Sequence, residues 1–215
     1  MLWAPGVALR WRHDTKMQLR RCGKSDVEVS VLGIGVWSFG GREGDYWGAQ
    51  DGKEAEAVVA AALDCGVNYF DTAEMYNDGR SEEAFGRALG RRRGEAVIGT
   101  KIMPANCSPE GVREHCEASL RRLGTDYVDI YMVHWPVRDY PAADVFGALG
   151  ELRAGGKIRS VGVSNFGPAQ LAEAMATGVR IDANQVNYSL LSRAIELEIL
   201  PFCRAHDVGV VWVGP

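Results

Sequence analysis

Short apolar stretches alternate with stretches of helical spacing along almost the whole chain, and this alternation constrains the fold more than any other feature. Such a pattern is typical of parallel strands joined by right-handed crossover helices. Two short strands around a turn, in residues 18–30, predict an initial β-hairpin. Seven further strands are expected at residues 31–37, 67–70, 96–101, 127–134, 158–165, 181–188 and 208–213. Six helices are expected between them, at residues 52–66, 81–93, 108–124, 142–156, 167–178 and 193–207.

Seven β units in strict order, each followed by a helix except the last, favour a barrel over a doubly wound sheet. The predicted fold class is therefore α/β, a (β/α)8 TIM barrel that also carries the N-terminal β-hairpin. Barrels of this class typically need about 250 residues, whereas this chain has 215. We therefore expect a barrel that is incomplete at its C-terminus, with seven of the eight β units. Such a barrel has two unpaired strand edges, which favour aggregation.

The first residues differ in composition from the rest of the chain. Residues 1–16 include Arg10, Arg12 and Lys16 but only one acidic residue. A transit peptide is one interpretation of this stretch, but it lacks serine and is short, which favours a plain extension. We predict a disordered N-terminal extension, followed by one partial barrel domain at residues 17–215.

Composition excludes several kinds of partner. The chain is 47% apolar and 24% charged, with a net charge of −4, which is typical of a soluble globular protein. Nucleic acids and membrane surfaces require a basic face, so neither is an expected partner. No apolar run approaches the roughly 20 residues that span a bilayer. The five cysteines form no CxxC pair, which favours free thiols in a reducing compartment, the cytoplasm. The four histidines lie far apart, so no metal site is expected, and no oligomeric state is predicted.

Ionisable side chains stand where several predicted strands end. Asp71 stands directly at the end of the strand predicted from residue 67, after VNYF, and Tyr76 lies on the loop that follows. Lys101 ends the next strand, and His134 ends the one after it. The carboxyl ends of the strands form the active site of such barrels. We therefore expect these four side chains to converge at one mouth, although each of them alone has an ordinary structural explanation.

The chemistry of this set favours proton donation. A free tyrosine has a pKa of about 10, too high for an effective acid near neutrality. A neighbouring lysine cation lowers the pKa of a phenol, and an aspartate beside the lysine keeps the cation charged and in place. A histidine can donate a hydrogen bond to a substrate oxygen and orient it. The four residues together suit protonation of an oxygen that gains negative charge, as in carbonyl reduction by hydride.

Five motifs make the chain resemble the aldo-keto reductase family. In the family's order and spacing they are YFDTAEMYNDGRSEEAFGRAL, IGTKIMP, LGTDYVDIYMVHWP, SVGVSNF and NQVNYSLLSR. The resemblance covers roughly residues 17–215 and implies an oxidoreductase that reduces aldehyde or ketone carbonyls to alcohols. It implies hydride transfer from the cofactor NADP(H) to a small-molecule carbonyl substrate. The chain would then be a member truncated after its seventh strand.

The resemblance also implies catalytic roles for individual residues. Tyr76 would be the general acid, Asp71 and Lys101 would tune it, and His134 would orient the carbonyl. Trp37 would join Tyr76 and His134 on the substrate side, with plain core packing as the alternative for Trp37.

Cofactor contacts are implied in the same way. Ser164, Asn165 and Gln185 match the positions that bind the nicotinamide carboxamide, and Asp71 would also contact the cofactor. The alternative for Ser164 and Asn165 is a turn before the next helix.

Two departures from the family pattern limit these implications. An aromatic residue usually stacks on the nicotinamide near the end of the seventh strand, where this chain has Val213; the neighbouring Trp212 faces the opposite way. The family also continues into an eighth strand and a loop that binds the adenosine 2′-phosphate. NADPH preference and the specific substrate are therefore not predicted. A catalytically impaired, truncated barrel that acts as a binding or regulatory protein is the alternative function.

Overall fold

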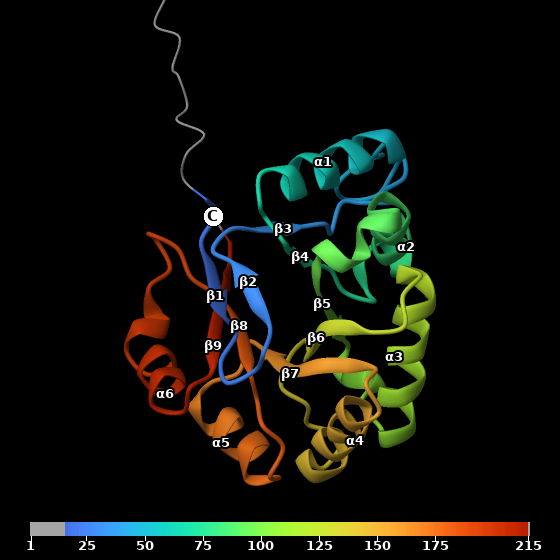
Figure 1. The fold of residues 1–215 in the computed structure, drawn as a ribbon. Helices are drawn as coiled ribbons and strands as arrows, with labels where there is room; N and C mark the ends of the chain where they lie inside the picture. Colours follow the sequence, from blue (N-terminus) through green and yellow to red (C-terminus); the bar gives the residue numbers. More distant parts are fainter. Residues whose placement is uncertain (1–15, 215) are drawn as a thin grey trace, which may run out of the picture.

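A curled sheet of seven parallel strands forms the centre of the protein. The computed structural model describes residues 16–214, and the strands follow one another in chain order from β3 to β9. Six α-helices connect consecutive strands and lie on the outer side of the curl (Figure 1). The strands are β3 (Gly33–Gly35), β4 (Tyr69–Asp71), β5 (Val97–Ile102), β6 (Val128–Val133), β7 (Ile158–Ser164), β8 (Ala183–Asn187) and β9 (Gly209–Val213). The helices are α1 (Gly52–Asp64), α2 (Arg80–Leu89), α3 (Pro109–Leu123), α4 (Ala142–Ala154), α5 (Pro168–Ala176) and α6 (Ile199–Ala205).

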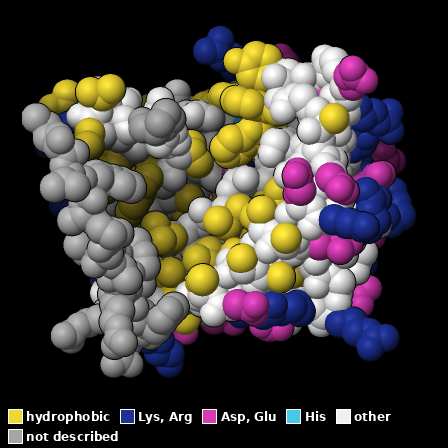
Figure 2. Space-filling view, turned by 90° about the horizontal axis from the view of Figure 1, so that it is seen from above, with side chains coloured by type: hydrophobic (Ala, Val, Ile, Leu, Met, Phe, Trp, Pro, Cys, Tyr) yellow, Lys and Arg dark blue, Asp and Glu magenta, His cyan; other side chains and the backbone are white. Residues whose placement is uncertain are grey.

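This architecture confirms the predicted fold class, a (β/α)8 barrel represented by seven β units. Strands β3 and β9 each pair on one side only within residues 16–214. Apolar side chains near these edges are exposed, with 60% of Leu32 and 58% of Trp212 accessible to solvent. Figure 2 views the molecule from the side of α1 and shows hydrophobic side chains spread over this face.

Alternating side chains of the strands build two separate apolar clusters. Outward-facing residues such as Phe70, Ile98 and Tyr131 pack with the helices, including Phe85 of α2 and Leu149 of α4, in the larger cluster. Inward-facing residues form the smaller cluster inside the curl. This two-sided burial explains why most of the strands are nearly continuous apolar runs in the sequence.

Tyr69 and Met132 fill the space inside the curl. A Cβ atom added to Gly99 would lie 2.7 Å from Tyr69 Oη, and one added to Gly33 would lie 2.6 Å from Tyr69 Cδ1. A Cβ atom at Gly162 would likewise lie 2.6 Å from Met132 Cγ. Glycine is therefore required at these strand positions because large side chains of the neighbouring strands occupy the interior.

The predicted hairpin covers the amino-terminal ends of the strands. Strands β1 (Leu19–Arg21) and β2 (Glu28–Ser30) pair antiparallel, and Figure 1 shows them in front of the curled sheet. Cys22 and Val27 pack into the inner cluster, and the Ser30 backbone N–H donates to Asn68 Oδ1 just before β4 (2.7 Å). The carboxyl ends of the strands are therefore the free mouth of the curl.

Two helices differ from their predicted extent. The helix expected at residues 81–93 ends at Leu89, because Gly90 has a left-handed φ of 49°, and a 3₁₀ turn, Gly90–Glu95, follows. The helix expected at residues 193–207 is split into the 3₁₀ turn Ala194–Glu196 and α6. Pro201 explains the split, because proline lacks an N–H and is tolerated only in the first turn of a helix.

The other boundary predictions agree closely with the structure. Ser108 caps α3 by accepting a hydrogen bond from the Gly111 N–H (3.0 Å). The disordered extension predicted for residues 1–16 lies outside the described residues, apart from Lys16. Within the described part of the chain, no helix combines the length and apolar character needed to cross a membrane.

Candidate active site

A buried ion pair stands at the mouth, between the ends of β4 and β5. Lys101 Nζ donates to Asp71 Oδ2 at 2.8 Å and to the Thr72 carbonyl oxygen at 2.7 Å. The Lys101 side chain is fully buried, and 11% of the Asp71 side chain is exposed. A buried ammonium is stable only when it is paired and hydrogen-bonded, so the contacts with Asp71 and Thr72 fix its position.

Tyr76 brings its hydroxyl to this cation from the loop after β4. The distance from Lys101 Nζ to Tyr76 Oη is 3.3 Å. Tyr76 begins a 3₁₀ turn in which Asn77 and Asp78 have left-handed φ values of 51° and 55°, a conformation that these two residue types tolerate best after glycine. The turn is held in place because Asn77 Nδ2 donates to the carbonyl oxygens of Trp37 and Phe39, both at 3.0 Å.

His134 is the fourth of the predicted catalytic residues, directly after β6. Its ring lies edge-on to Tyr76, with 5.8 Å between the ring centroids, and stacks on Trp135 at 3.9 Å. Its Nδ1 atom is buried without a hydrogen-bond partner among residues 16–214. Burial and the nearby Lys101 ammonium lower the pKa of His134 to about 3. The imidazole is therefore neutral at physiological pH.

The neutral state of His134 has a direct consequence for NMR titration. The folded protein should show no protonation of His134 between pH 8 and pH 5, whereas the unfolded chain titrates near pH 6.5. Because only the unfolded state binds this proton, His134 should destabilise the fold as the pH falls from about 6.5 to about 3. The ¹⁵N chemical shifts of the imidazole report the protonation state of the His134 ring in the folded protein. A His134→Gln variant assigns the signal. Protonation of the folded ring near pH 6 would contradict the burial described above.

Polar side chains follow at the ends of β7 and β8. Ser164 and Gln185 are buried, whereas Asn165 is exposed and has a left-handed φ of 63°. Asn165 Nδ2 donates to the His134 carbonyl oxygen and to Ser164 Oγ, both at 3.1 Å. The structure therefore brings these three residues to the same mouth as the Asp71–Lys101 pair.

Gln185 makes a contact that its sequence position did not indicate. Its Nε2 donates to Asp71 Oδ1 at 2.8 Å, across 114 positions of the chain. Tyr69 Oη donates to the same oxygen at 3.3 Å, and burial beside Asp71 raises the pKa of Tyr69 well above its usual range. Both oxygens of Asp71 are thus supplied with donors. Tyr69 was missed by sequence reasoning, although its place two residues before Asp71 puts it on the same face of β4.

Glu74 is a second residue that sequence reasoning missed. Its Oε1 accepts from the Met103 N–H and from Asn106 Nδ2, both at 2.8 Å, and its Oε2 lies 2.6 Å from His115 Nδ1. These contacts join the loop that carries Tyr76 to the loop after β5. No spacing rule connects residues so far apart in the chain, so only the folded structure reveals them.

Trp37 lies at the mouth beside the ion pair. Its ring covers Gly35, where an added Cβ atom would clash with Trp37 Cζ3, and Gly35 is paired with Asp71 in the sheet. The side chain is 43% exposed and contacts Trp47, with 5.6 Å between the ring centroids. Trp37 is therefore a rim residue, and the core alternative is wrong.

Val213 and Trp212 end β9 at the unpaired edge. Trp212 is paired with the outward-facing Val186, and Val213 is paired with Asn187. The Trp212 ring packs edge-on against Tyr188, with 6.5 Å between the centroids. The two residues thus face opposite ways, as their positions in the strand predict, and Val213 shares the inward side with Gln185.

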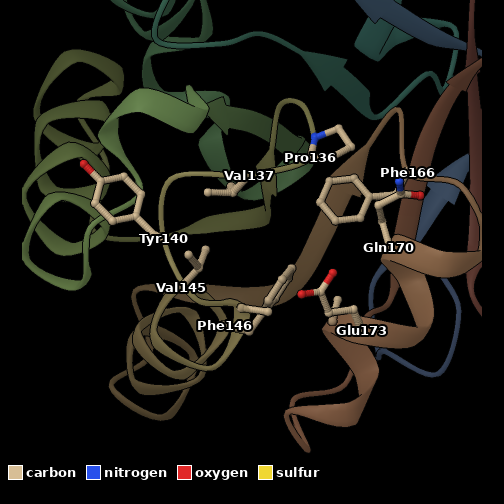
Figure 3. Close-up of a pocket in the computed structure, with 10 residues that line it drawn as sticks. Pro136, Val137, Tyr140, Val145, Phe146, Phe166, Gln170 and Glu173 are labelled. Atoms are coloured by element: carbon tan, nitrogen blue, oxygen red, sulfur yellow. The ribbon is translucent and has the colours of Figure 1, made fainter.

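A small pocket with mostly apolar lining residues lies between α4, α5 and the loop after β6 (Figure 3). Phe146 and Phe166 form an edge-to-face pair across it, with 6.4 Å between the centroids. Glu173 is its only carboxylate, and none of the eight predicted site residues lines it. The mouth of the curl is therefore the candidate active site.

The sequence matches one family model and several known proteins. The model of the aldo/keto reductase family matches residues 31–215. An NADH-specific methylglyoxal reductase of Escherichia coli is 38% identical over 90% of this chain, and a probable voltage-gated potassium channel subunit beta of Arabidopsis thaliana is 34% identical over 93%. The chain spans 65% and 64% of the length of these two relatives.

A solved structure shows the same arrangement of the backbone. The crystal structure of an aldo-keto reductase from Klebsiella pneumoniae in complex with NADPH superimposes with a TM-score of 0.80 and 36% sequence identity. The match covers 90% of this chain and 66% of that protein.

Proposed function

Because the chain belongs to the aldo/keto reductase family, we propose that it is an NADP(H)-dependent oxidoreductase that reduces aldehyde or ketone carbonyls to alcohols. One observation carries this proposal. The buried Lys101 ammonium lies 2.8 Å from Asp71 Oδ2 and 3.3 Å from Tyr76 Oη at the mouth of the strands. A hydroxyl at the mouth with a buried cation directly behind it supports the assignment of Tyr76 as a proton donor and of Lys101 as the charge that stabilises it.

Tyr76 acts as the general acid in this proposal. A carbonyl oxygen that receives a hydride on its carbon becomes negatively charged, and the Tyr76 hydroxyl gives it a proton. The Lys101 ammonium stabilises the phenolate that remains. Asp71 holds the ammonium in position through Oδ2, and its other oxygen, Oδ1, accepts hydrogen bonds from Gln185 and Tyr69.

His134 orients the carbonyl in this proposal. Because its pKa is held near 3, the imidazole is neutral and carries one N–H, which serves as a hydrogen-bond donor without competing as an acid. Trp37 lies on the substrate side of the same mouth. The expected substrate is a small carbonyl compound.

The cofactor site is proposed from groups that remain free. Within residues 16–214, no hydrogen bond uses the Ser164 hydroxyl as a donor, or Asn165 Oδ1 and Gln185 Oε1 as acceptors. One donor and two acceptors complement the carbonyl oxygen and the NH₂ group of a carboxamide. These residues therefore fit the nicotinamide carboxamide, beside Asp71. When bound, NADPH supplies the hydride.

A second candidate function is a binding or regulatory role without efficient catalysis. The unpaired edges of β3 and β9 within the described residues favour it, as does Val213 in place of an aromatic residue. The Arabidopsis relative, named as a probable channel subunit, offers a precedent for such a role.

We also propose that the protein is located in the cytoplasm, because all five of its cysteines are free thiols.

A combined binding and turnover experiment separates the two candidates. Titration with NADPH and NADH, followed by nucleotide fluorescence, should show saturable binding. Absorbance at the nicotinamide band should then fall when aldehydes such as methylglyoxal are added. Binding without oxidation would favour the regulatory role. Absence of both would exclude the reductase proposal for this chain.

A further inference from the structure

We propose that Trp47 is a specificity-determining residue that selects carbonyl substrates bearing an aromatic ring. The inference rests on the proposed reductase function, and it extends the site along the loop between β3 and α1. Three observations carry it. The rings of Trp37, Trp47 and Tyr46 form a connected row, the rings are exposed, and hydrogen bonds brace the loop that holds them.

The row of rings begins with Trp37, at the mouth formed by the ends of β3 and β4. Trp37 lies over Gly35, which is paired with Asp71, and its carbonyl oxygen accepts a hydrogen bond from Asn77, the neighbour of Tyr76. The Trp47 ring lies 5.6 Å from the Trp37 ring at an interplanar angle of 56°. A substrate with its carbonyl at Tyr76 would therefore extend along Trp37 toward Trp47.

These rings are exposed to a degree that core packing does not explain. Trp47 is 57% and Tyr46 is 90% accessible, and the two rings pack edge-to-face at 4.7 Å. Large aromatic side chains lose free energy when they stay in water, and contiguous exposed apolar groups mark binding sites. The row begins at Trp37, which lies over Gly35 next to Asp71, so the occupant that it fits best is the distal part of a substrate bound at the mouth.

The loop that carries Trp47 is held rigidly. Arg80 of α2 donates to Asp45 Oδ2 at 2.6 Å and to the Gly40 carbonyl oxygen at 3.1 Å. Asp45 Oδ2 also accepts a hydrogen bond from the Arg42 N–H at 2.7 Å. The Gly48 N–H donates to the Asp45 carbonyl oxygen at 2.9 Å. These bonds flank Trp47 on both sides. An exposed ring on a braced loop is preorganised for contact with a ligand.

An aromatic ring is the group that this row recognises most selectively. Edge-to-face and offset ring pairs add attraction beyond the burial of apolar area, corresponding to roughly 2- to 10-fold in affinity. A saturated ring of the same size gains the burial but not this addition. Selectivity between the two ring types therefore isolates the contribution of Trp47.

The test compares benzaldehyde with cyclohexanecarbaldehyde, and benzyl alcohol with cyclohexylmethanol. In Trp47→Leu, the ratio of kcat/KM for the aromatic aldehyde over the saturated one should fall roughly 2- to 10-fold. Trp47→Phe should retain most of the ratio. The ratio of the affinity for benzyl alcohol to the affinity for cyclohexylmethanol, measured calorimetrically without turnover, should fall by a similar factor in the leucine variant.

Trp212→Leu is the matched control. Trp212 is 58% exposed, close to the 57% of Trp47, and also packs edge-on against a tyrosine, but it faces outward on β9. This variant should leave both ratios unchanged. The proposal is overturned if Trp47→Leu changes neither ratio, or lowers the values for both ring types equally. If no aldehyde is reduced at all, the reductase proposal fails, and the two alcohols still decide the role of Trp47.

Discussion

Lys101→Met should lower the free energy of unfolding by about 3–5 kcal/mol, because it leaves the Asp71 carboxylate buried without its cation. Lys101 is fully buried, and its ammonium makes hydrogen bonds to Asp71 Oδ2 and to the Thr72 carbonyl oxygen. Urea unfolding followed by circular dichroism measures the change. Catalysis should be lost as well, since the stabilising cation beside Tyr76 is removed.

Two further variants identify the cause of this loss. Lys157→Met removes a surface ion pair with Glu117, in which both side chains are 42% exposed, and should cost about 1 kcal/mol or less. The double variant Asp71→Asn/Lys101→Met should recover part of the stability, because no unpaired charge remains. If Lys101→Met lost no more free energy of unfolding than Lys157→Met, the description of Asp71 and Lys101 as a buried ion pair would be wrong.

Tyr76→Phe should lower kcat/KM for aldehydes by roughly 10²- to 10⁴-fold, the usual contribution of a positioned acid. The variant removes only the hydroxyl that lies 3.3 Å from Lys101 Nζ, so the ring can still pack beside His134. Steady-state NADPH oxidation measures the effect. Tyr127→Phe, which alters a tyrosine just before β6 at the opposite end of the strands, should leave activity unchanged. If Tyr76→Phe kept the activity of the wild type, Tyr76 could not be the general acid.

The strand ends were the most informative part of the sequence. Parallel strands place their carboxyl ends at one edge, so Asp71, Lys101 and His134 could be assigned to a common mouth from alternation alone. The Lys101–Tyr76 contact followed from the same reasoning. What alternation could not supply is the environment of each group. The low pKa of His134 depends on burial and on an ammonium from another strand.

Long-range contacts and local breaks escaped prediction for physical reasons. Gln185 reaches Asp71 only because the sheet curls far enough to bring β8 opposite β4. The helix expected at residues 193–207 has a strong apolar pattern, which hid the break that Pro201 imposes. The row from Trp37 to Tyr46 lies in a loop without periodicity, and its position depends on the bonds that Arg80 makes with Asp45 and Gly40.

Single-turnover reduction of an aldehyde by the wild type and by Tyr76→Phe, each saturated with NADPH, tests the central claim most directly. We predict equal affinity for NADPH in both proteins, because Tyr76 is not among the residues proposed to bind the carboxamide. We predict that the reduction step is roughly 10² times slower or more in the variant. Equal single-turnover rates in the two proteins would contradict the assignment of Tyr76, beside Lys101 and Asp71, as the proton donor.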